Sequence, residues 1–209
     1  MYERIFRRLR SFLLVGAAMV VVTLVLAGAI YGFIQYGGNL HAVEVGTFYR
    51  SAQLSGEDLR QVIKAKQIRT VLNLRGKNSG KDWYDEEIHA TDAEGVLHLD
   101  YSLSARREVT LTQMQDIMRL IKDSPKPILV HCNAGADRTG LVSALFELSK
   151  GKDPLIASEQ LSLRYGHFPY LGSKTIAMDR SFASFAQAGL ASASGNIEAD
   201  VGFPAAVGH

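Results

Sequence analysis

The stretch HCNAGADRTG, residues 131–140, constrains the fold of this chain more than any other. It follows the apolar run Pro127–Val130, which has the character of a buried strand, and it precedes Leu141–Ser149, which has the character of a buried helix. Between a strand and a helix, loop amides and the helix N-terminus all point at one place and favour an anion there. The sequence therefore predicts a phosphate-binding loop.

Two side chains of this loop carry chemistry. Cys132 is the only cysteine of the chain, so it cannot form an intramolecular disulfide. Amides that bind a phosphate also stabilise a thiolate, which is a nucleophile. Arg138 offers a planar fork that matches two phosphate oxygens. Gly135 would let the backbone curl tightly, and Gly140 would allow close packing.

Strands alternate with helices through the rest of the chain. Predicted strands cover residues 43–49, 70–74, 96–101 and 126–131, and predicted helices cover 56–66, 82–94, 111–121, 141–149, 154–165 and 174–188. Thr110 and Asp153 are the expected N-caps of two of these helices. This order predicts an α/β fold, with a mostly parallel central sheet flanked by helices.

The N-terminal segment predicts a membrane helix. Residues 12–34 carry no charge and are numerous enough to cross about 30 Å of hydrocarbon. Arginines at 4, 7, 8 and 10 precede them, and the positive-inside rule keeps that end in the cytoplasm. The expected location is a single pass through the inner membrane with the domain on the periplasmic, extracytoplasmic side. Ala27-Gly28-Ala29 also fits a cleavage site, so the segment is either an anchor or a signal segment.

The expected organisation follows from these segments. It comprises a basic cytoplasmic N-terminus at 1–11, the membrane or signal segment at 12–34, a linker at 35–42, a catalytic domain at 43–188 and a disordered tail at 189–209. The net charge of +2 indicates no nucleic-acid partner, because such domains show a clustered basic face. Six histidines without paired spacing and one cysteine indicate no metal site.

The loop HCNAGADRTG resembles the signature His-Cys-x5-Arg-Thr-Gly of the cysteine-based protein tyrosine and dual-specificity phosphatases, in a bacterial membrane-anchored form. With FYRSAQ at 48–53 and VLNLRG at 71–76, the resemblance extends over residues 43–187. It implies the cysteine-phosphatase fold and a phosphomonoester hydrolase without a cofactor.

The resemblance also implies roles for the loop residues. Cys132 would attack phosphorus and form a phosphocysteine, while Arg138 and the loop amides hold the oxygens. Thr139 would stabilise the thiolate as it leaves, and His131 would order the loop. The phosphate-binding loop consists of Asn133, Ala134, Gly135, Ala136, Asp137 and Arg138.

The leaving group needs a general acid, for which two aspartates compete. Asp100 is preferred, because it ends a predicted strand 32 residues before Cys132, a separation similar to that in dual-specificity enzymes. Its surroundings do not match a Trp-Pro-Asp pattern. Asp137 is the alternative, since some lipid-directed relatives use an aspartate at that place in the loop. It could instead orient the arginine or cap the helix.

The substrate stays open. Lys77, Lys81, Arg106 and Arg107 lie on loops that should follow strand C-termini, where they could bind further phosphates or an anionic lipid surface, or be ordinary solvated charges. Phosphotyrosine or phosphoserine proteins, membrane phospholipids, phosphoinositides and inositol phosphates all fit. A catalytically silent, membrane-anchored phosphate-binding adaptor, a pseudophosphatase, is the alternative from another functional class.

Overall fold

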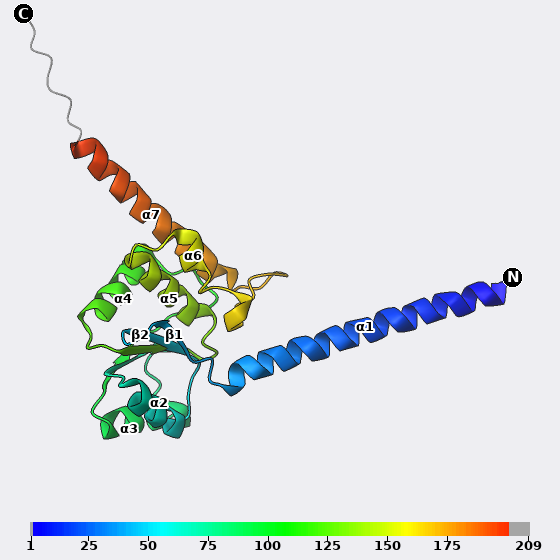
Figure 1. The fold of residues 1–209 in the computed structure, drawn as a ribbon, viewed down its shortest axis with the longest axis horizontal. Helices are drawn as coiled ribbons and strands as arrows, with labels where there is room; N and C mark the ends of the chain where they lie inside the picture. The colour runs from blue at the N-terminus through cyan, green and yellow to red at the C-terminus, as the bar shows by residue number, and fades with distance from the viewer. Residues whose placement is uncertain (1, 201–209) are drawn as a thin grey trace, which may run out of the picture. The chain divides into compact units, whose positions relative to one another are not determined.

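The computed structural model describes residues 2–200, in two units that meet between Gly37 and Gly38. The first unit is helix α1, Tyr2–Tyr36, which contains the arginine-rich segment as well as the apolar one (Figure 1). Across residues 2–200, no helix combines the length with the apolar character that crossing a membrane requires. This finding corrects both the predicted membrane helix at 12–34 and the predicted inner-membrane location with an extracytoplasmic domain.

The second unit is built on a five-stranded sheet with the order β1-β2-β5-β3-β4. The strands are β1 His41–Glu44, β2 Phe48–Ser51, β3 Thr70–Asn73, β4 Leu97–Asp100 and β5 Ile128–His131. Strands β2, β5, β3 and β4 are parallel, while β1 pairs with β2 in the antiparallel direction. The predicted single strand at 43–49 is therefore wrong. The chain turns there at Gly46, whose φ of +75° suits glycine.

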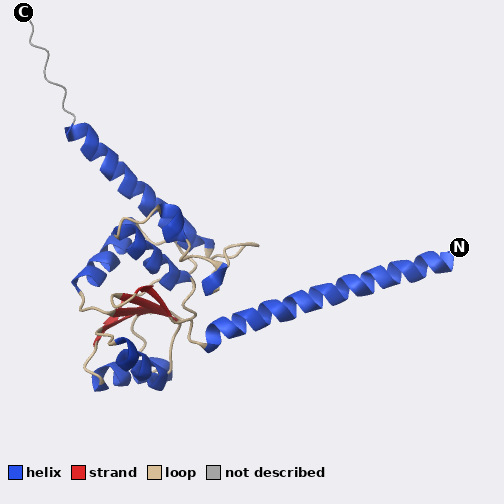
Figure 2. Cartoon of the chain, viewed as in Figure 1, coloured by secondary structure: helices blue, strands red, loops and turns tan. Residues whose placement is uncertain are grey.

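Helices cover both faces of the sheet (Figure 2). They are α2 Gly56–Lys66, α3 Asp82–Ala93, α4 Leu111–Asp123, α5 Asp137–Ser149, α6 Pro154–Ser158, the 3-10 helix η1 Leu163–Tyr165 and α7 Ile176–Asp200. Helices α2 and α3 lie on one face, and α4 and α5 lie on the other with α6 and α7 beyond them (Figure 1). The predicted α/β fold is confirmed.

Most predicted helices agree with the observed ones because their caps are local signals. The predicted N-cap Thr110 forms a capping box with Gln113 at the start of α4, and the predicted N-cap Asp153 accepts from the backbone N–H of Leu155 at the start of α6. The helix predicted at 154–165 instead ends at Ser158. The carbonyl and side-chain oxygens of Gln160 both accept from Arg50, which directs this segment away from a continued helix.

The end of α7 also differs from the prediction. The helix continues to Asp200, so residues 189–200 are helical where a disordered tail is expected from the sequence. Residues 201–209 of that predicted tail lie outside the described residues.

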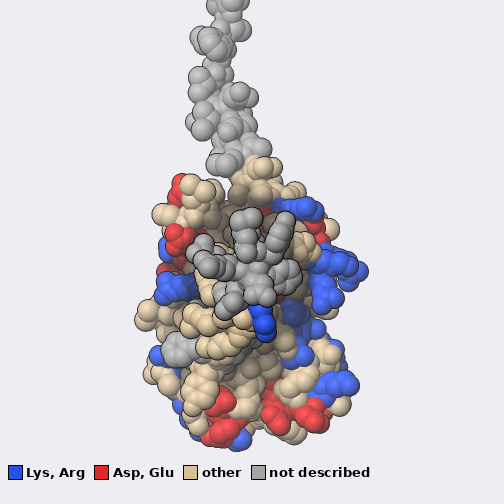
Figure 3. All heavy atoms as spheres, turned by 90° about the vertical axis from the view of Figure 1, so that its right-hand side faces the viewer, with Lys and Arg blue, Asp and Glu red and all other residues tan. Residues whose placement is uncertain are grey.

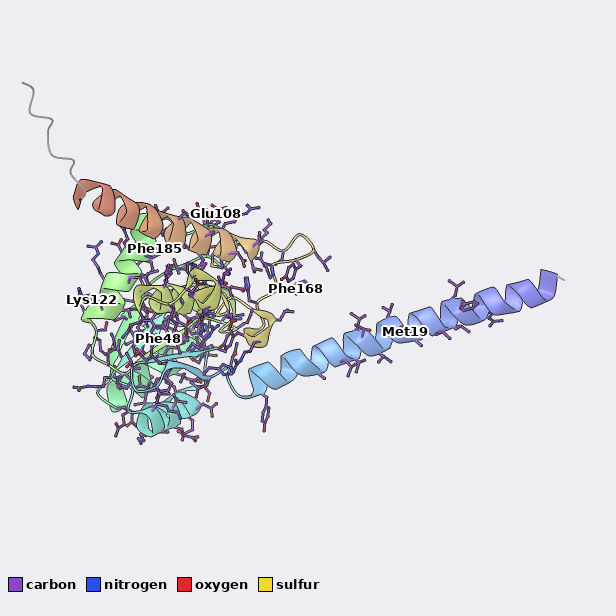
Figure 4. All side chains as sticks on the ribbon, turned by 45° about the horizontal axis from the view of Figure 1, so that its top comes forward. Met19, Phe48, Glu108, Lys122, Phe168 and Phe185 are labelled. Carbon is purple, nitrogen blue, oxygen red and sulfur yellow. The ribbon has the colours of Figure 1, made fainter. Side chains whose placement is uncertain are left out.

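A large apolar core fixes the sheet against α4, α5 and α7. Phe48 of β2 stacks on Phe146 of α5, with ring centroids 4.4 Å apart, and Figure 4 shows Phe48 inside the domain and Phe185 on α7. Because the strands are in parallel register, Ser51, His131 and Asn73 lie side by side at their carboxyl ends, with Asp100 next in the row. Functional side chains are expected at such an edge.

Candidate active site

The thiol of Cys132 follows β5 directly and is 2% exposed. The chain then curls through residues 133–136 and enters α5 at Asp137. Gly135 has a φ of +70°, and a Cβ there would lie 2.7 Å from the Ser51 carbonyl oxygen and 2.6 Å from the Ala52 nitrogen. Only glycine fits this position, so the loop packs tightly against the end of β2.

Three successive carbonyls of the loop are held from outside it. The backbone N–H of Gln53 donates to the Asn133 carbonyl at 3.0 Å, and the side-chain amide of Asn39 donates to the Ala134 carbonyl at 2.9 Å. The guanidinium of Arg50 donates to the Gly135 carbonyl at 2.7 Å. In a planar trans peptide the N–H points opposite to the C=O. The N–H groups of residues 134–136, which belong to the same three peptides, therefore point to the other side of the loop, where an anion would lie.

Arg50 is a fully buried support of this loop that sequence reasoning missed. Its Nη1 donates to the carbonyl oxygen of Gln160 at 2.9 Å and to the side-chain oxygen of Gln160 at 2.6 Å. Its guanidinium also lies over the ring of Tyr165, 3.8 Å from the centroid. Burial lowers the pKa of Arg50 to about 10, so it still carries a charge at neutral pH. The available signal was an arginine within an otherwise buried strand.

Arg138 crosses from α5 to two other loops. Its Nη1 donates to the carbonyls of Leu74 and Leu103, each at 3.3 Å. Its Nε and the hydroxyl of Thr139 are buried and have no hydrogen-bond partner within the described part of the chain. Buried polar groups usually have a partner, so these two donors are available to a ligand.

His131 is ordered by a carboxylate that the sequence did not reveal. Its Nε2 lies 3.1 Å from Glu87 Oε1, and Nε2 of His98 lies 2.7 Å from the same oxygen. Gln53 donates to the other oxygen of Glu87 at 2.5 Å. Burial alone would raise the pKa of Glu87, but His131 and these hydrogen bonds hold it well below its usual range. An ionised Glu87 therefore joins α3 to the end of β5.

Asp100 occupies the end of β4 and accepts two hydrogen bonds. Nδ2 of Asn73 donates to Oδ1 at 2.8 Å, and the phenol of Tyr84 donates to Oδ2 at 2.5 Å. Burial and the hydrogen bond to Asp100 raise the pKa of Tyr84 far above its usual value. Tyr84 thus remains a donor, and it fixes the orientation of the Asp100 carboxylate.

Asp137 has a separate set of partners. Its Oδ1 lies 2.7 Å from Nδ1 of His167, and Nε2 of His167 lies 2.9 Å from Oδ2 of Asp179 on α7. His167 is fully buried. Burial would lower the pKa of His167, but the two carboxylates outweigh it and the pKa is raised. Among the described residues, Asp137 and Asp100 therefore have no hydrogen-bond partner in common.

The contacts of His167 with Asp137 and Asp179 predict that the stability of the fold depends on pH. Because the pKa of His167 is raised in the folded state, protonation of His167 stabilises the fold. This contribution is complete below the unfolded pKa of about 6.5, and it is lost as the pH rises through the folded pKa. The free energy of unfolding should therefore fall in His167→Gln by about 1–3 kcal/mol at pH 5.5, and by less at pH 9. Urea unfolding at both pH values measures this. An equal loss at both would show that charge on His167 does not matter.

The four predicted basic residues, Lys77, Lys81, Arg106 and Arg107, are all exposed. Lys77 borders a cavity of about 370 Å³, and Arg107 borders one of about 290 Å³ with Leu103 and Ser104. On the face in Figure 3, basic and acidic side chains both occur. These four residues thus lie on the loops expected from the sequence, in contact with solvent.

The arrangement suits a tetrahedral anion. A buried thiol lies at the end of β5, loop carbonyls are anchored outward, and the buried Nε of Arg138 has no partner among residues 2–200. Such a group of donors can hold three oxygens of a phosphoryl group while the sulfur approaches phosphorus from the side opposite the leaving group. The site can therefore bind phosphate and offer it a nucleophile.

Known proteins share this architecture. A model described as "tyrosine phosphatase family" matches residues 34–154, which is more than half of the chain. The structure of P. aeruginosa TpbA is 22% identical, covers 72% of this chain and 84% of its own, and has a TM-score of 0.53. TpbA was also solved in complex with phosphotyrosine.

Two further solved structures are similar in fold. The catalytic core of the PP-IP phosphatase SIW14 from S. cerevisiae is 17% identical, with 68% of this chain and 83% of that chain covered and a TM-score of 0.56. A putative phosphatase from Shewanella putrefaciens CN-32 is 16% identical, with 70% and 92% covered and a TM-score of 0.54. No curated protein matches the sequence.

Proposed function

Since the chain belongs to the tyrosine phosphatase family, we propose that it hydrolyses phosphomonoesters in the manner of a dual-specificity phosphatase, through a phosphocysteine on Cys132. The observation that carries this proposal is the loop around the thiol. Its carbonyls at Asn133, Ala134 and Gly135 are anchored outward, so the amides are preorganised for an anion.

In the first step the thiolate of Cys132 attacks phosphorus in line with the departing oxygen. The S–P bond forms as the P–O bond breaks, and the leaving oxygen takes a proton from Asp100. Arg138 and the loop amides hold the three remaining oxygens. In the second step Asp100 takes a proton from water, whose oxygen attacks phosphorus and releases the thiolate. The buried hydroxyl of Thr139, which lacks an acceptor among the described residues, would donate to that thiolate.

The choice of Asp100 as the acid rests on the partners of the two aspartates. Oδ1 of Asp137 lies 2.7 Å from Nδ1 of His167, whose Nε2 contacts Asp179 on α7, so this carboxylate is engaged in a contact that joins α5 to α7. We assign Asp137 instead to orienting the start of α5. Asp100 is oriented by neutral donors at the strand ends.

The acid assignment predicts a dependence on the leaving group. Asp100→Asn should slow hydrolysis of alkyl phosphates by roughly 10²–10⁴-fold, and should slow activated aryl phosphates much less, because these need no proton. Steady-state kcat/KM on both classes measures the effect, with Asp137→Asn as the matched control. If Asp137→Asn shows this selectivity and Asp100→Asn does not, the roles are reversed.

The substrate panel follows from the proposed chemistry. It contains a phosphotyrosine peptide, a phosphoserine peptide, inositol phosphates, and phosphatidylglycerophosphate and phosphoinositides in mixed micelles. Phosphate release by the full chain is measured on each. Turnover of any of them supports the enzyme, whereas tight phosphate binding without turnover would support the adaptor. Preference for a lipid headgroup would extend the proposal to membrane phospholipids.

A further inference from the structure

Arg75 is a second arginine beside the phosphate loop, and hydrolysis as proposed above does not use it. It follows Leu74, whose carbonyl accepts from Arg138. Its Cζ lies 3.4 Å from the centroid of the Trp83 ring, and its Nη1 donates to Gln53 Oε1 at 3.0 Å. The backbone N–H of the same Gln53 donates to the Asn133 carbonyl in the loop. Arg75 is therefore fixed at the rim of the cradle by α3 and by the segment after β2.

The two arginines lie close enough to affect each other. Burial and the charge of Arg138 lower the pKa of Arg75, and Glu87 and Cys132 partly offset this. Within residues 2–200, neither Arg75 nor Arg138 forms an ion pair with a carboxylate. A second anionic group on a substrate that is bound at Arg138 could therefore form an ion pair with Arg75.

Arg75 also retains hydrogen-bonding capacity. A guanidinium has five N–H donors in a fixed plane. Gln53 Oε1 is the one acceptor that the described residues offer to it, and Trp83 covers one of its faces. Stacking on an aromatic ring fixes the plane of the fork before a ligand arrives, which reduces the entropy lost on binding.

We propose that Arg75 forms a second anion subsite beside the phosphate loop, which selects small substrates that carry a second phosphoryl group near the phosphomonoester to be hydrolysed. This rests on the proposed function, since the first phosphate occupies the loop around Cys132. Arg138 would hold the phosphoryl group that reacts, and Arg75 would hold its neighbour, with the Gln53 and Trp83 contacts keeping the guanidinium in place.

The test compares ligands that cannot be hydrolysed. Isothermal titration of the full chain with methylphosphonate, and with methylene-, ethylene- and propylenebisphosphonate, gives the ratio of affinities for two phosphonates over one. In the wild type at least one bisphosphonate should bind about 10- to 100-fold more tightly than methylphosphonate. In Arg75→Met that ratio should fall close to one while methylphosphonate still binds.

Arg69→Met is the matched control, because Arg69 is an exposed arginine just before the other end of β3 and its loss changes the net charge equally. It should keep the ratio of the wild type. Equal binding of one and two phosphonates by the wild type would overturn the subsite, as would an equal loss for both ligands in Arg75→Met. Failure of methylphosphonate itself to bind the wild type would instead contradict the proposed function.

Discussion

Replacing Cys132 by serine is expected to reduce phosphate release by about 10⁴-fold or more, because the hydroxyl is a far weaker nucleophile than a thiolate in the same cradle. Binding of phosphate should persist, since the donors around the thiol remain. The buried thiol is nearly isosteric with the serine hydroxyl, so the core around α5 should keep its packing. Phosphate release from an activated aryl phosphate and titration with inorganic phosphate measure the two quantities.

The two readouts separate the enzyme from the adaptor. Lost turnover with retained phosphate binding in Cys132→Ser supports the nucleophile. If the wild type binds phosphate and releases none from any aryl phosphate between pH 5 and 7, the adaptor is the better account. Retained turnover in Cys132→Ser would assign hydrolysis to another residue.

Replacing Arg50 by methionine is the second change with a large expected effect. It removes the donors to the Gly135 carbonyl and to both oxygens of Gln160, all of them buried. Losing the partners of two buried residues costs about 1–3 kcal/mol each, so the free energy of unfolding should fall by about 2–6 kcal/mol. With the Gly135 peptide released, kcat/KM should fall roughly 10²-fold, as for other small misplacements near a reacting group.

Urea unfolding and steady-state kinetics measure these two losses. Arg50→Lys keeps the positive charge but lacks the planar guanidinium, so it should recover only part of the stability and part of kcat/KM. Arg60→Met, at an exposed position on α2, is the control and should leave both unchanged. An Arg50→Met protein with normal kcat/KM would show that the outward anchor at Gly135 does not organise the cradle.

Local signals in the sequence were sufficient for the scaffold of the site. The apolar run before His131, the glycine at 135 and the helical pattern over 141–149 each express a local preference. The structure has the strand and the tight loop in those places, and its helix begins four residues earlier than predicted, at Asp137. Caps at Thr110 and Asp153 fixed the starts of two helices in the same way.

The supports of the site were not predictable from local sequence, because each acts across long separations. Arg50 reaches Gln160, Glu87 reaches His131, and His167 joins Asp137 to α7. A charged residue looks like an ordinary surface residue until the fold buries it beside its partner. The same holds for Arg75, whose stacking on Trp83 depends on how α3 packs beside β3.

The two main errors have different physical origins. The first strand was predicted as one segment over 43–49, whereas a positive φ at Gly46 turns the chain there into a hairpin. The membrane segment was predicted from the uncharged run at 12–34, and within the described residues no helix meets the requirements of length and apolarity for a span.

The central claim is that Cys132 becomes phosphorylated during turnover. Rapid acid quench of the full chain with an activated aryl phosphate, followed by peptide mass spectrometry, tests it directly. The account predicts one added phosphoryl group on the peptide that contains Cys132, at a higher level in Asp100→Asn because water is then activated more slowly, and none in Cys132→Ser. Turnover with no phosphate on Cys132 at any quench time, or phosphate on another residue, would contradict it.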